Sequence, residues 1–522
     1  MNDPGPASPF PGARPYRAGE ELPSPRRAAQ ARDVAVLWRS RRVTIVHGPA
    51  GSGRTSLLEA AVRPLLEGGA HRAPLLGAVL PDRPFPTAAL PAHEPFEFAL
   101  LRGWAPTTWP TALGGTTVRD WLRDRCAESP RPVLAGIDQA DDLFQRLTAA
   151  QRERLMAGLR GALGDNPSLR LLFSVRTGRL GALRDAVGPA DTTEYRLGGL
   201  EAADARAVLE PLTTVPAGLP PAAADAVVDD LMTIRTTDED GRAVTRRAET
   251  VHTWSLQQAS LQLWRSRRMR GRLARSGRDA RTVVDQALGA ALWRVVSRVA
   301  ELFDRDPGWL GRALAEALVA PSGAGRDADA HDSGVPEEIL RALQDRQVLD
   351  GDGRRFRPAA DRLAAPLALL ATGVDRPAPS PASPSEQLRA ALAAGPDRAL
   401  TLAESALAAG RGDSATEMDA RILLGDLAFA AGERETAERH YRAAALAAEV
   451  RRDVPMVGAL LAAIGRIHRL GGDPGGALGL LKSASARLPG DRAVQAELAR
   501  AFVASGQPRA AAALLGGPLD QR

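Results

Sequence analysis

The stretch HGPAGSGRTSLLEA, residues His47–Ala60, decides the fold of this chain. From Gly48 to Thr55 it fits the pattern G-x-x-x-x-G-[K/R]-[S/T], with Arg54 at the position that usually carries lysine. Glycines let a backbone wrap closely around a phosphate, so that successive N–H groups and the dipole of the following helix face its oxygens. The pattern therefore predicts a phosphate-binding loop (P-loop).

The residues around this loop predict an α/β P-loop NTPase fold. Residues 41–48 form a β-branched run ending in glycine, typical of a buried parallel strand, and residues 55–69 have helical apolar spacing. The apolar positions of that helix are Leu57, Leu58, Ala61, Leu65 and Leu66. Further strands are predicted at 73–80, 131–138 and 169–176, and helices at 118–129 and 149–163. This alternation implies a parallel sheet with right-handed crossovers and helices on both faces.

The loop itself supplies the predicted nucleotide contacts. We expect nine consecutive residues to bind the nucleotide: Gly48, Pro49, Ala50, Gly51, Ser52, Gly53, Arg54, Thr55 and Ser56. The Thr55 hydroxyl is a predicted Mg²⁺ ligand. An arginine fork is larger than a lysine ammonium and positions its charge differently, so ATP and Mg²⁺ binding is expected to survive while hydrolysis is expected to be slow.

Acidic residues downstream are the predicted catalytic partners. Asp138 ends an apolar strand and could hold Mg²⁺ through water. Asp141 and Asp142 follow, where one could orient the attacking water or both could simply cap the next helix. Arg176 ends the next strand, the place of a γ-phosphate sensor; a surface arginine at a strand end explains it equally well.

Composition shifts divide the rest of the chain. A proline- and glycine-rich leader is predicted at 1–30, the P-loop domain at 31–200 and a helical arm at 201–270. A helix, hairpin and helix around Gly351–Gly353 suit a winged-helix-like domain at 271–372, and a proline- and serine-rich linker is predicted at 373–387.

Internal repeats follow the linker, in residues 388–522. Small residues recur in pairs, at Gly425 and Ala437, Gly465 and Ala477, and Ala499 and Ala511. The step from Gly465 to Ala499 matches the 34-residue period of tetratricopeptide repeats, and the longer preceding step requires an extended helix or loop. An all-α solenoid that binds a protein partner is predicted, with an alanine-rich helical bundle as the alternative.

An ordered set of motifs resembles a known family. PFPGARPYRAGE (9–20) is similar to the opening P-[YF]-P-G-[LA]-R-x-[YF], GPAGSGRTSLL (48–58) to GPSGSGKSSLL, GIDQADDLF (136–144) to DQFEELF, and SVRTGRL (174–180) to RADFL. LGGLEAADARAVLEPL (197–212) and WSLQQASLQLW (254–264) resemble a leucine-rich segment and an LLQ-x-LW helix. Over roughly 9–370, the chain resembles the bacterial novel STAND NTPases, signal-transduction ATPases related to AAA+ and apoptotic NTPases.

The resemblance implies a signalling switch, with four departures. Arg54 replaces lysine, Asp141 and Asp142 replace two glutamates, R-A-D becomes R-T-G at 176–178, and a G-R-E motif is replaced near 22–30. Together they favour weakened hydrolysis. In such a switch, nucleotide state shifts a closed monomer toward an open, assembling form, which implies a nucleotide-dependent homo-oligomer.

Composition limits the other classes. The 522 residues carry a formal net charge of +6, and the densest basic run, 264–281, allows DNA binding but equally suits a solvated helix. The tryptophans at 254, 264, 293 and 309 are expected in the core. One cysteine, Cys126, and 7 scattered histidines predict no disulfide framework and no histidine or cysteine metal cluster. With no signal peptide or membrane span, a cytoplasmic protein is expected. The rival functions are a DNA-binding transcriptional regulator and a degenerate NTPase acting as an interaction scaffold.

Overall fold

The computed structural model describes residues 8–67, 73–188, 191–215, 218–237, 243–275, 279–372 and 382–515. The chain divides into two compact units. Unit 1 comprises Met1–Pro74, Cys126–Gln145 and Asn166–Pro381, and unit 2 comprises Leu75–Arg125, Arg146–Asp165 and Ala382–Arg522. This division differs from the predicted boundaries, because two segments of the predicted P-loop domain 31–200 belong to unit 2 together with the repeats.

A parallel sheet is the centre of the α/β part, as predicted. Its strands are β1 (Val43–Gly48), β2 (Leu75–Gly77), β3 (Val133–Ile137), β4 (Leu169–Arg176) and β5 (Thr192–Arg196), in the order β2-β3-β4-β1-β5. In unit 1, β3 pairs with β4, β4 with β1 and β1 with β5, all in parallel. Every residue of β1 and β3 is buried. The polar edge strand β5, TTEYR, was not predicted, because it has no apolar run.

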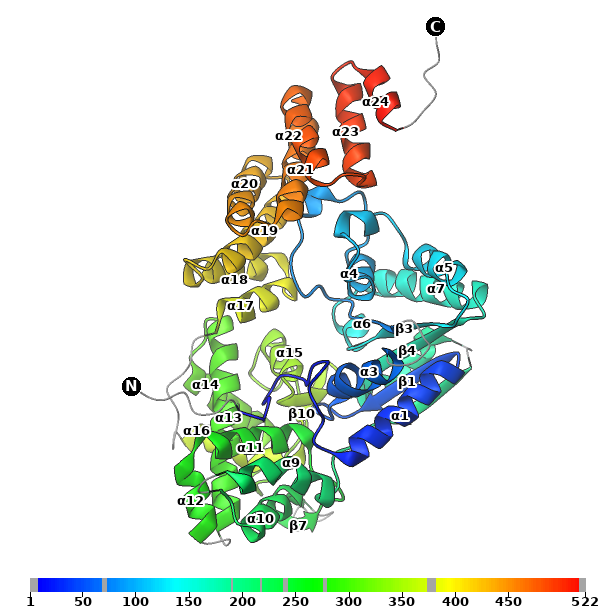
Figure 1. Ribbon diagram of the computed structural model, residues 1–522. Coiled ribbons are helices and arrows are strands. Elements are labelled where there is room, and N and C mark those ends of the chain that lie inside the picture. Colours follow the sequence, from blue (N-terminus) through cyan, green and yellow to red (C-terminus); the bar gives the residue numbers. More distant parts are fainter. Residues whose placement is uncertain are drawn as a thin grey trace. The chain divides into compact units, whose positions relative to one another are not determined.

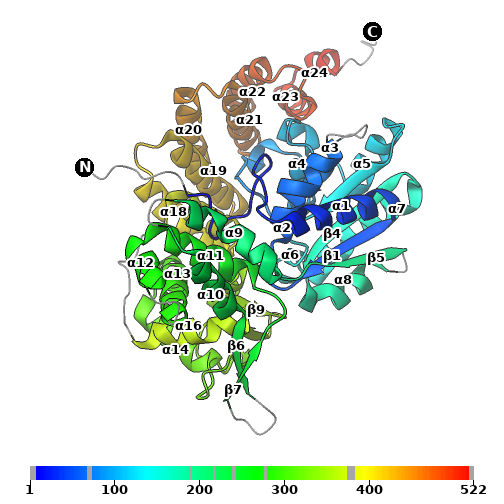
Figure 2. The same cartoon turned by 60° about the horizontal axis from the view of Figure 1, so that its bottom comes forward.

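Helices cover this sheet on both sides. Within unit 1, Figure 2 shows α1 (Pro25–Ser40) on one side of the strands and α8 (Leu180–Val187) on the other. The α1 helix begins inside the predicted leader 1–30, at a Ser24 cap whose side chain accepts from the Arg27 N–H. The extended leader therefore ends at Ser24, six residues before its predicted end at residue 30.

The helix after the P-loop is interrupted by a π-turn. It consists of α2 (Arg54–Leu57), the π-helical turn η1 (Leu58–Val62) and α3 (Arg63–Glu67). The wider turn shifts the phase of the buried face, so Leu65 is 46% exposed while Val62 and Leu66 are fully buried. The prediction that Leu65 faces the core is wrong for this reason.

The rest of unit 1 is mainly helical, and all of its helices except α6 contribute to one apolar core. Its helices are α6 (Asp142–Gln145), α9 (Ala202–Thr214), α10 (Pro221–Met232), α11 (Thr253–Arg265), α12 (Arg267–Arg275), α13 (Ala280–Leu302), α14 (Pro307–Leu318), α15 (Glu337–Asp345) and α16 (Ala364–Thr372). The predicted boundary between 270 and 271 falls inside α12. Trp254 and Trp293 are buried, and Trp264 and Trp309 pack against the core, as predicted.

Two hairpins accompany these helices. The predicted hairpin around Gly351–Gly353 is present as β9 (Leu349–Gly351) and β10 (Arg355–Pro358), and β10 also pairs with β8 (Ala328–Asp329). A second hairpin, β6 (Thr233–Thr237) with β7 (Ala243–Arg247), was not predicted.

Unit 2 combines three helices of the α/β part with the repeats (Figure 1). The three are α4 (Pro95–Trp104), α5 (Val118–Ala127, whose last two residues fall in unit 1) and α7 (Ala149–Asp165). The repeat helices are α17 (Pro384–Leu392), α18 (Pro396–Ala409), α19 (Ser414–Ala430), α20 (Arg434–Val450), α21 (Val454–Leu470), α22 (Pro474–Arg487), α23 (Arg492–Ala504) and α24 (Pro508–Leu514). Residues 373–381 of the predicted linker 373–387 lie outside the described residues, and 384–387 are already helical.

The predicted small residues lie where paired helices cross. A Cβ at Gly425 would lie 2.6 Å from the Tyr441 ring, and one at Gly465 would lie 2.7 Å from Leu481 Cγ. The step from Gly425 to Gly465 is longer than the step from Gly465 to Ala499 for two reasons. The intervening helix α20 has 17 residues, whereas α22 has 14. Gly465 is also the twelfth residue of α21, whereas Ala499 is the eighth residue of α23. The spacing thus predicted the pairing and required an extended helix or loop, and the structure has the extended helix.

Candidate functional site

The P-loop connects β1 to α2 and needs its glycines. Gly51 and Gly53 have φ values of +71° and +88°, a region that disfavours side chains. A Cβ at Gly48 would lie 2.2 Å from the Leu197 carbonyl oxygen, and one at Gly51 would lie 2.8 Å from His252 Nε2. Sterics alone therefore require glycine at these positions.

Thr55 and Asp138 meet beside this loop. The Thr55 hydroxyl donates to Asp138 Oδ2 over 2.6 Å. Asp138 is 6% exposed, and its second oxygen, Oδ1, is buried with no hydrogen-bond partner among the described residues. Ser52 Oγ is also buried and unpartnered within the described part of the chain. Buried polar atoms without partners are costly, so this site is built to receive polar groups.

Arg54 folds back over its own loop. Its Nη1 donates to the carbonyl oxygens of Gly48 and Pro49, and its Nη2 lies 3.7 Å from Asp141 Oδ2. Burial lowers the pKa of Arg54, and the nearby Asp141 carboxylate opposes this shift. The buried Nε has no acceptor among the residues described here, so it is free to donate to an anionic oxygen.

Asp141 links this arginine to the next strand. Its Oδ1 accepts from the Arg176 backbone N–H over 3.0 Å, so its two carboxylate oxygens face two different elements. The Arg176 guanidinium is buried and donates to the Gln344 carbonyl oxygen of α15 over 3.2 Å. Asp142 is buried as the first residue of α6. Gln139, between the strand and these acids, has φ +54°, an unusual value for a non-glycine residue.

The structure thus gathers Arg54, Thr55, Asp138, Asp141 and Arg176 at the carboxyl ends of β1, β3 and β4. This is where open α/β sheets bind their ligands. Among the described residues, no group of three or more histidine, cysteine, aspartate or glutamate side chains could hold a metal ion by itself. Within the same residues, no helix has the length and apolar character needed to span a membrane.

Sequence reasoning missed two residues that hold the loop. The first is Arg27 of α1, whose Nη2 donates to the Ser52 carbonyl oxygen over 2.8 Å and to the Gly198 carbonyl oxygen over 2.9 Å. The same nitrogen donates to Thr253 Oγ1 at the start of α11 over 3.2 Å. Burial lowers the pKa of Arg27 to about 10. The signal lay in the segment 22–30, where the resemblance departs from the family pattern.

The second missed residue is His252, immediately before α11. Its Nε2 lies 2.8 Å from the Ala50 carbonyl oxygen, and its Nδ1 lies 2.9 Å from Ser255 Oγ. Because a carbonyl can only accept, Nε2 carries the proton in this contact. Burial lowers the pKa of His252, which keeps the ring neutral. The start of α11 is thereby attached to the loop.

The leader packs on the same helix. The Tyr16 N–H donates to Ser56 Oγ over 3.1 Å, and its hydroxyl oxygen accepts from Gln257 Nε2 over 3.0 Å. The leader therefore connects the residue that follows the P-loop threonine to α11.

A cavity of about 390 Å³ begins at the P-loop. Its lining comprises Pro49, Thr177, Gly178, Arg196, Asp327, Asp350, Gly351, Asp352, Arg355, Phe356 and Arg357. Strand ends of the sheet and the β9–β10 hairpin thus face each other across it. Its volume is in the range of small-molecule sites, and its lining carries three arginines and three aspartates, so both signs of charge are offered.

The sheet order and the loop define a P-loop NTPase. Residues 9–350 match the model of the family Novel STAND NTPase 1, and residues 470–522 match a tetratricopeptide repeat model. The chain belongs to the novel STAND NTPases. No curated protein matches it in a sequence comparison.

Solved structures resemble the chain only distantly. One is the Aeropyrum pernix ORC2 protein in ADPNP–ADP complexes, 15% identical, with 70% of this chain and 97% of that chain covered and a TM-score of 0.37. A second is a STAND protein with a tetratricopeptide repeat sensor from Pyrococcus horikoshii, 12% identical, with 98% and 79% covered and a TM-score of 0.29. At such scores these likenesses define neither ligand nor partner.

Proposed function

We propose that this STAND NTPase is an ATP-binding switch whose nucleotide state controls assembly and the binding of a protein partner through the repeats. The observation that carries the proposal is the Thr55–Asp138 contact beside a glycine loop, with a buried carboxylate oxygen left unpartnered among the described residues. A scaffold with no ligand would gain nothing from keeping this polar group buried.

The loop residues have the proposed binding roles. The backbone of Gly48, Pro49, Ala50, Gly51, Ser52, Gly53, Arg54, Thr55 and Ser56 would face the phosphates. The unpartnered Ser52 Oγ and Arg54 Nε point to the same anionic ligand.

The donors present fit a magnesium ion. A threonine hydroxyl and an aspartate are hard oxygen ligands, and Mg²⁺ usually takes only one or two such groups plus water and substrate phosphates. When bound, Mg²⁺ neutralises charge on the β- and γ-phosphates. Thr55 and Asp138 would hold it, and Asp138 Oδ1 is the atom left available.

Slow hydrolysis follows from how the remaining groups are held. The Arg54 guanidinium is hydrogen-bonded to loop carbonyls and lies near Asp141, so part of its charge is already used. Asp141 accepts from the Arg176 N–H and approaches Arg54, which gives it a positioning role, and either Asp141 or Asp142 would orient the attacking water. Arg176 would sense the γ-phosphate from the end of β4.

Three contacts would pass nucleotide state to the helical part of unit 1. His252 and Arg27 join the loop to the start of α11, and Arg176 joins β4 to α15. A phosphate that moves the loop or Arg176 alters these bonds directly. The order of α15, the β9–β10 hairpin and α16 supports the proposal that this region is a winged-helix-like domain.

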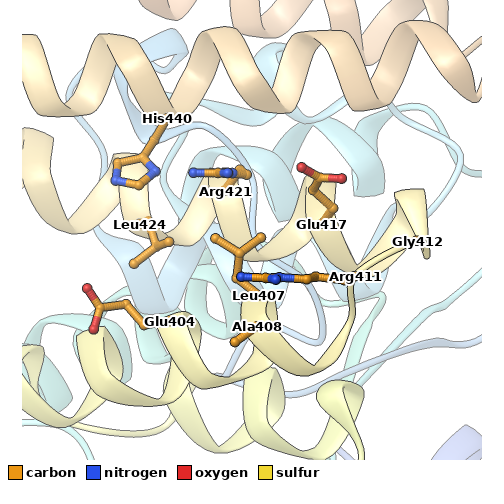
Figure 3. A pocket seen from close by; sticks show the side chains of 9 residues that line it. All are labelled: Glu404, Leu407, Ala408, Arg411, Gly412, Glu417, Arg421, Leu424 and His440. Carbon is orange, nitrogen blue, oxygen red and sulfur yellow. The ribbon is translucent and has the colours of Figure 1, made fainter.

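The repeats would provide the protein-binding surface. A cavity of about 450 Å³ lies among α18, α19 and α20 (Figure 3). Its lining carries Glu404 and Glu417 as well as Arg411 and Arg421, so both signs of charge are offered. Such a surface suits polar groups of a protein rather than a phosphate.

DNA binding is less well supported. In the basic run, Arg270 is buried and donates to the carbonyl oxygens of Leu263 and Trp264, so it caps α11 instead of facing solvent. At least this arginine of the basic run 264–281 therefore stabilises the fold and is not available to contact DNA.

Binding of a fluorescent ATP analogue tests the proposal. We expect Mg²⁺-dependent binding to the wild type, and affinity about tenfold weaker in Thr55→Val and Asp138→Asn. Thr401→Val, an exposed threonine of α18, is the matched control and should bind as the wild type does. Wild-type protein that binds no nucleotide would contradict the switch and favour the scaffold.

A further inference from the structure

A segment of unit 2 lies on the repeat helices as a bound peptide would. Residues PDRPFPTAALPA (81–92) connect β2 to α4 and contain the short 3₁₀ turn η2 (Thr87–Ala89). This turn packs on α21 and also contacts α19, the first helices of two repeat pairs. In Figure 1 the light-blue chain before α4 runs beside α21.

Polar contacts fix the segment at two points. Thr87 donates to Asp426 Oδ1 twice, from its N–H over 2.7 Å and from its hydroxyl over 2.9 Å. The Tyr441 hydroxyl donates to the same oxygen over 2.7 Å. Four residues earlier, Arg83 donates to both carboxylate oxygens of Asp419, over 3.1 and 3.0 Å.

Apolar and main-chain contacts lie between and beyond these points. Ala88 is fully buried in the same apolar cluster as Met418, Ile422 and Ile464. Arg466 of α21 donates to the carbonyl oxygens of Ala88 and Leu90. Burial raises the pKa of Asp426 to about 7, and the hydrogen bonds from Tyr441 and Thr87 oppose this shift.

These contacts have the form of peptide recognition. Arg466 of the repeats donates to main-chain carbonyls of the segment, and carboxylates of the repeats accept from the Thr87 hydroxyl and the Arg83 guanidinium. The small apolar side chain of Ala88 is buried in the core of the repeats. Prolines at 84, 86 and 91 restrict the free segment, so less conformational entropy is lost when it binds.

We propose that the face of α19 and α21 is a peptide-binding surface occupied by the chain's own residues 83–91, and that the partner is a protein carrying a segment of the same chemistry. That chemistry is an arginine followed four residues later by serine or threonine and two small apolar residues. The inference rests on the proposed role of the repeats as a protein-binding surface and names the partner's recognition segment.

The internal segment has an advantage over a free peptide because it belongs to the same chain as the surface. The segment is held between β2 and α4 of the same chain, so it acts at an effective concentration on the order of millimolar, which a free peptide must exceed to bind. Weakening the internal segment should therefore expose the surface to a partner without altering the surface itself.

The test uses the full chain without nucleotide and a fluorescein-labelled peptide of residues 81–92. The opened variant Arg83→Ala/Thr87→Val weakens the internal segment only. We expect it to bind the peptide at least about tenfold more tightly than the wild type. Adding Asp419→Arg should abolish binding, and a peptide with Arg83→Glu should restore it.

The same titration can overturn the inference. Equal affinity of the opened variant and the wild type, or affinity unaffected by Asp419→Arg, would show that the segment is ordinary packing. If the double variant melts below the wild type, Thr87→Val alone replaces it. Because nucleotide is omitted, the outcome is independent of whether the P-loop binds ATP.

Discussion

In the proposed switch, Arg54 is the residue on which ATP turnover would depend most directly. A lysine ammonium is compact and would not span the Gly48 and Pro49 carbonyls and approach Asp141 in the way that this guanidinium does. The motif predicted a glycine-rich turn between a strand and a helix, and the structure has this turn between β1 and α2; that the nine residues bind nucleotide stays a prediction. It could not predict Arg27 or His252, because their contacts join residues 25 and 202 positions apart in the chain.

Arg54→Lys is expected to raise ATP turnover by about tenfold, because it frees the charge at this position for the phosphates. Steady-state phosphate release measures it. Arg63→Lys, on the partly exposed α3, is the matched control and should not change the rate. Slower turnover in Arg54→Lys would mean that the arginine is itself the active group.

Gly51→Ala is expected to lower the free energy of unfolding of unit 1 by about 1–3 kcal/mol, because the positive φ and the close approach of His252 both oppose a side chain. Chemical denaturation measures this. Gly181→Ala in α8, where a Cβ meets nothing within 4 Å, should be neutral or stabilising by up to about 1 kcal/mol. Equal effects would contradict the steric argument.

Helices and strands with strong patterns were predicted, and weak or locally altered ones were not. The strands β1, β3 and β4 are buried and mainly apolar, whereas β5 is polar and recognisable only from its pairing with β1. The π-turn η1 changes which side of a helix is buried without changing composition. The α1 helix had a signal, Ser24 and Pro25 as its cap and first residue, that the proline-rich leader obscured.

In the repeats, Gly425→Ala should destabilise unit 2 by about 1–3 kcal/mol, because the new Cβ would lie 2.6 Å from the Tyr441 ring. Thermal unfolding followed by circular dichroism measures it. Gly479→Ala lies on the exposed side of α22 with nothing within 4 Å, and should stabilise by up to about 1 kcal/mol. Comparable melting of both variants would contradict close helix packing at Gly425.

The junction of α11 with the P-loop should be pH-dependent. The pKa of His252 is lowered by burial, so its stabilising contribution is fully present above its ordinary value of about 6.5 and is lost as pH falls below it. The loss is at most about 1.4 kcal/mol per pH unit. The difference in unfolding free energy between wild type and His252→Gln should shrink from pH 7.5 to 5.5. A constant difference would show that the ring does not titrate in this range.

The division of the chain into two compact units does not follow the order of its motifs along the sequence. Sequence shifts indicated a P-loop domain, arms and repeats in succession, yet residues 75–125 and 146–165 are grouped with the repeats. The reason is physical: the contacts of residues 83–91 with α19 and α21 depend on side chains more than 300 positions away. The pattern of apolar residues within 83–91, or within α19 and α21, cannot predict that these parts of the chain contact each other.

Hydrogen exchange in the two nucleotide states tests the switch most directly. Backbone amides at the start of α11, such as Leu256, which donates to the His252 carbonyl, should exchange at different rates with Mg²⁺–ATP and with Mg²⁺–ADP. The difference should vanish in Thr55→Val. Identical exchange in both states, with nucleotide bound, would contradict a switch in which the loop and α11 move together.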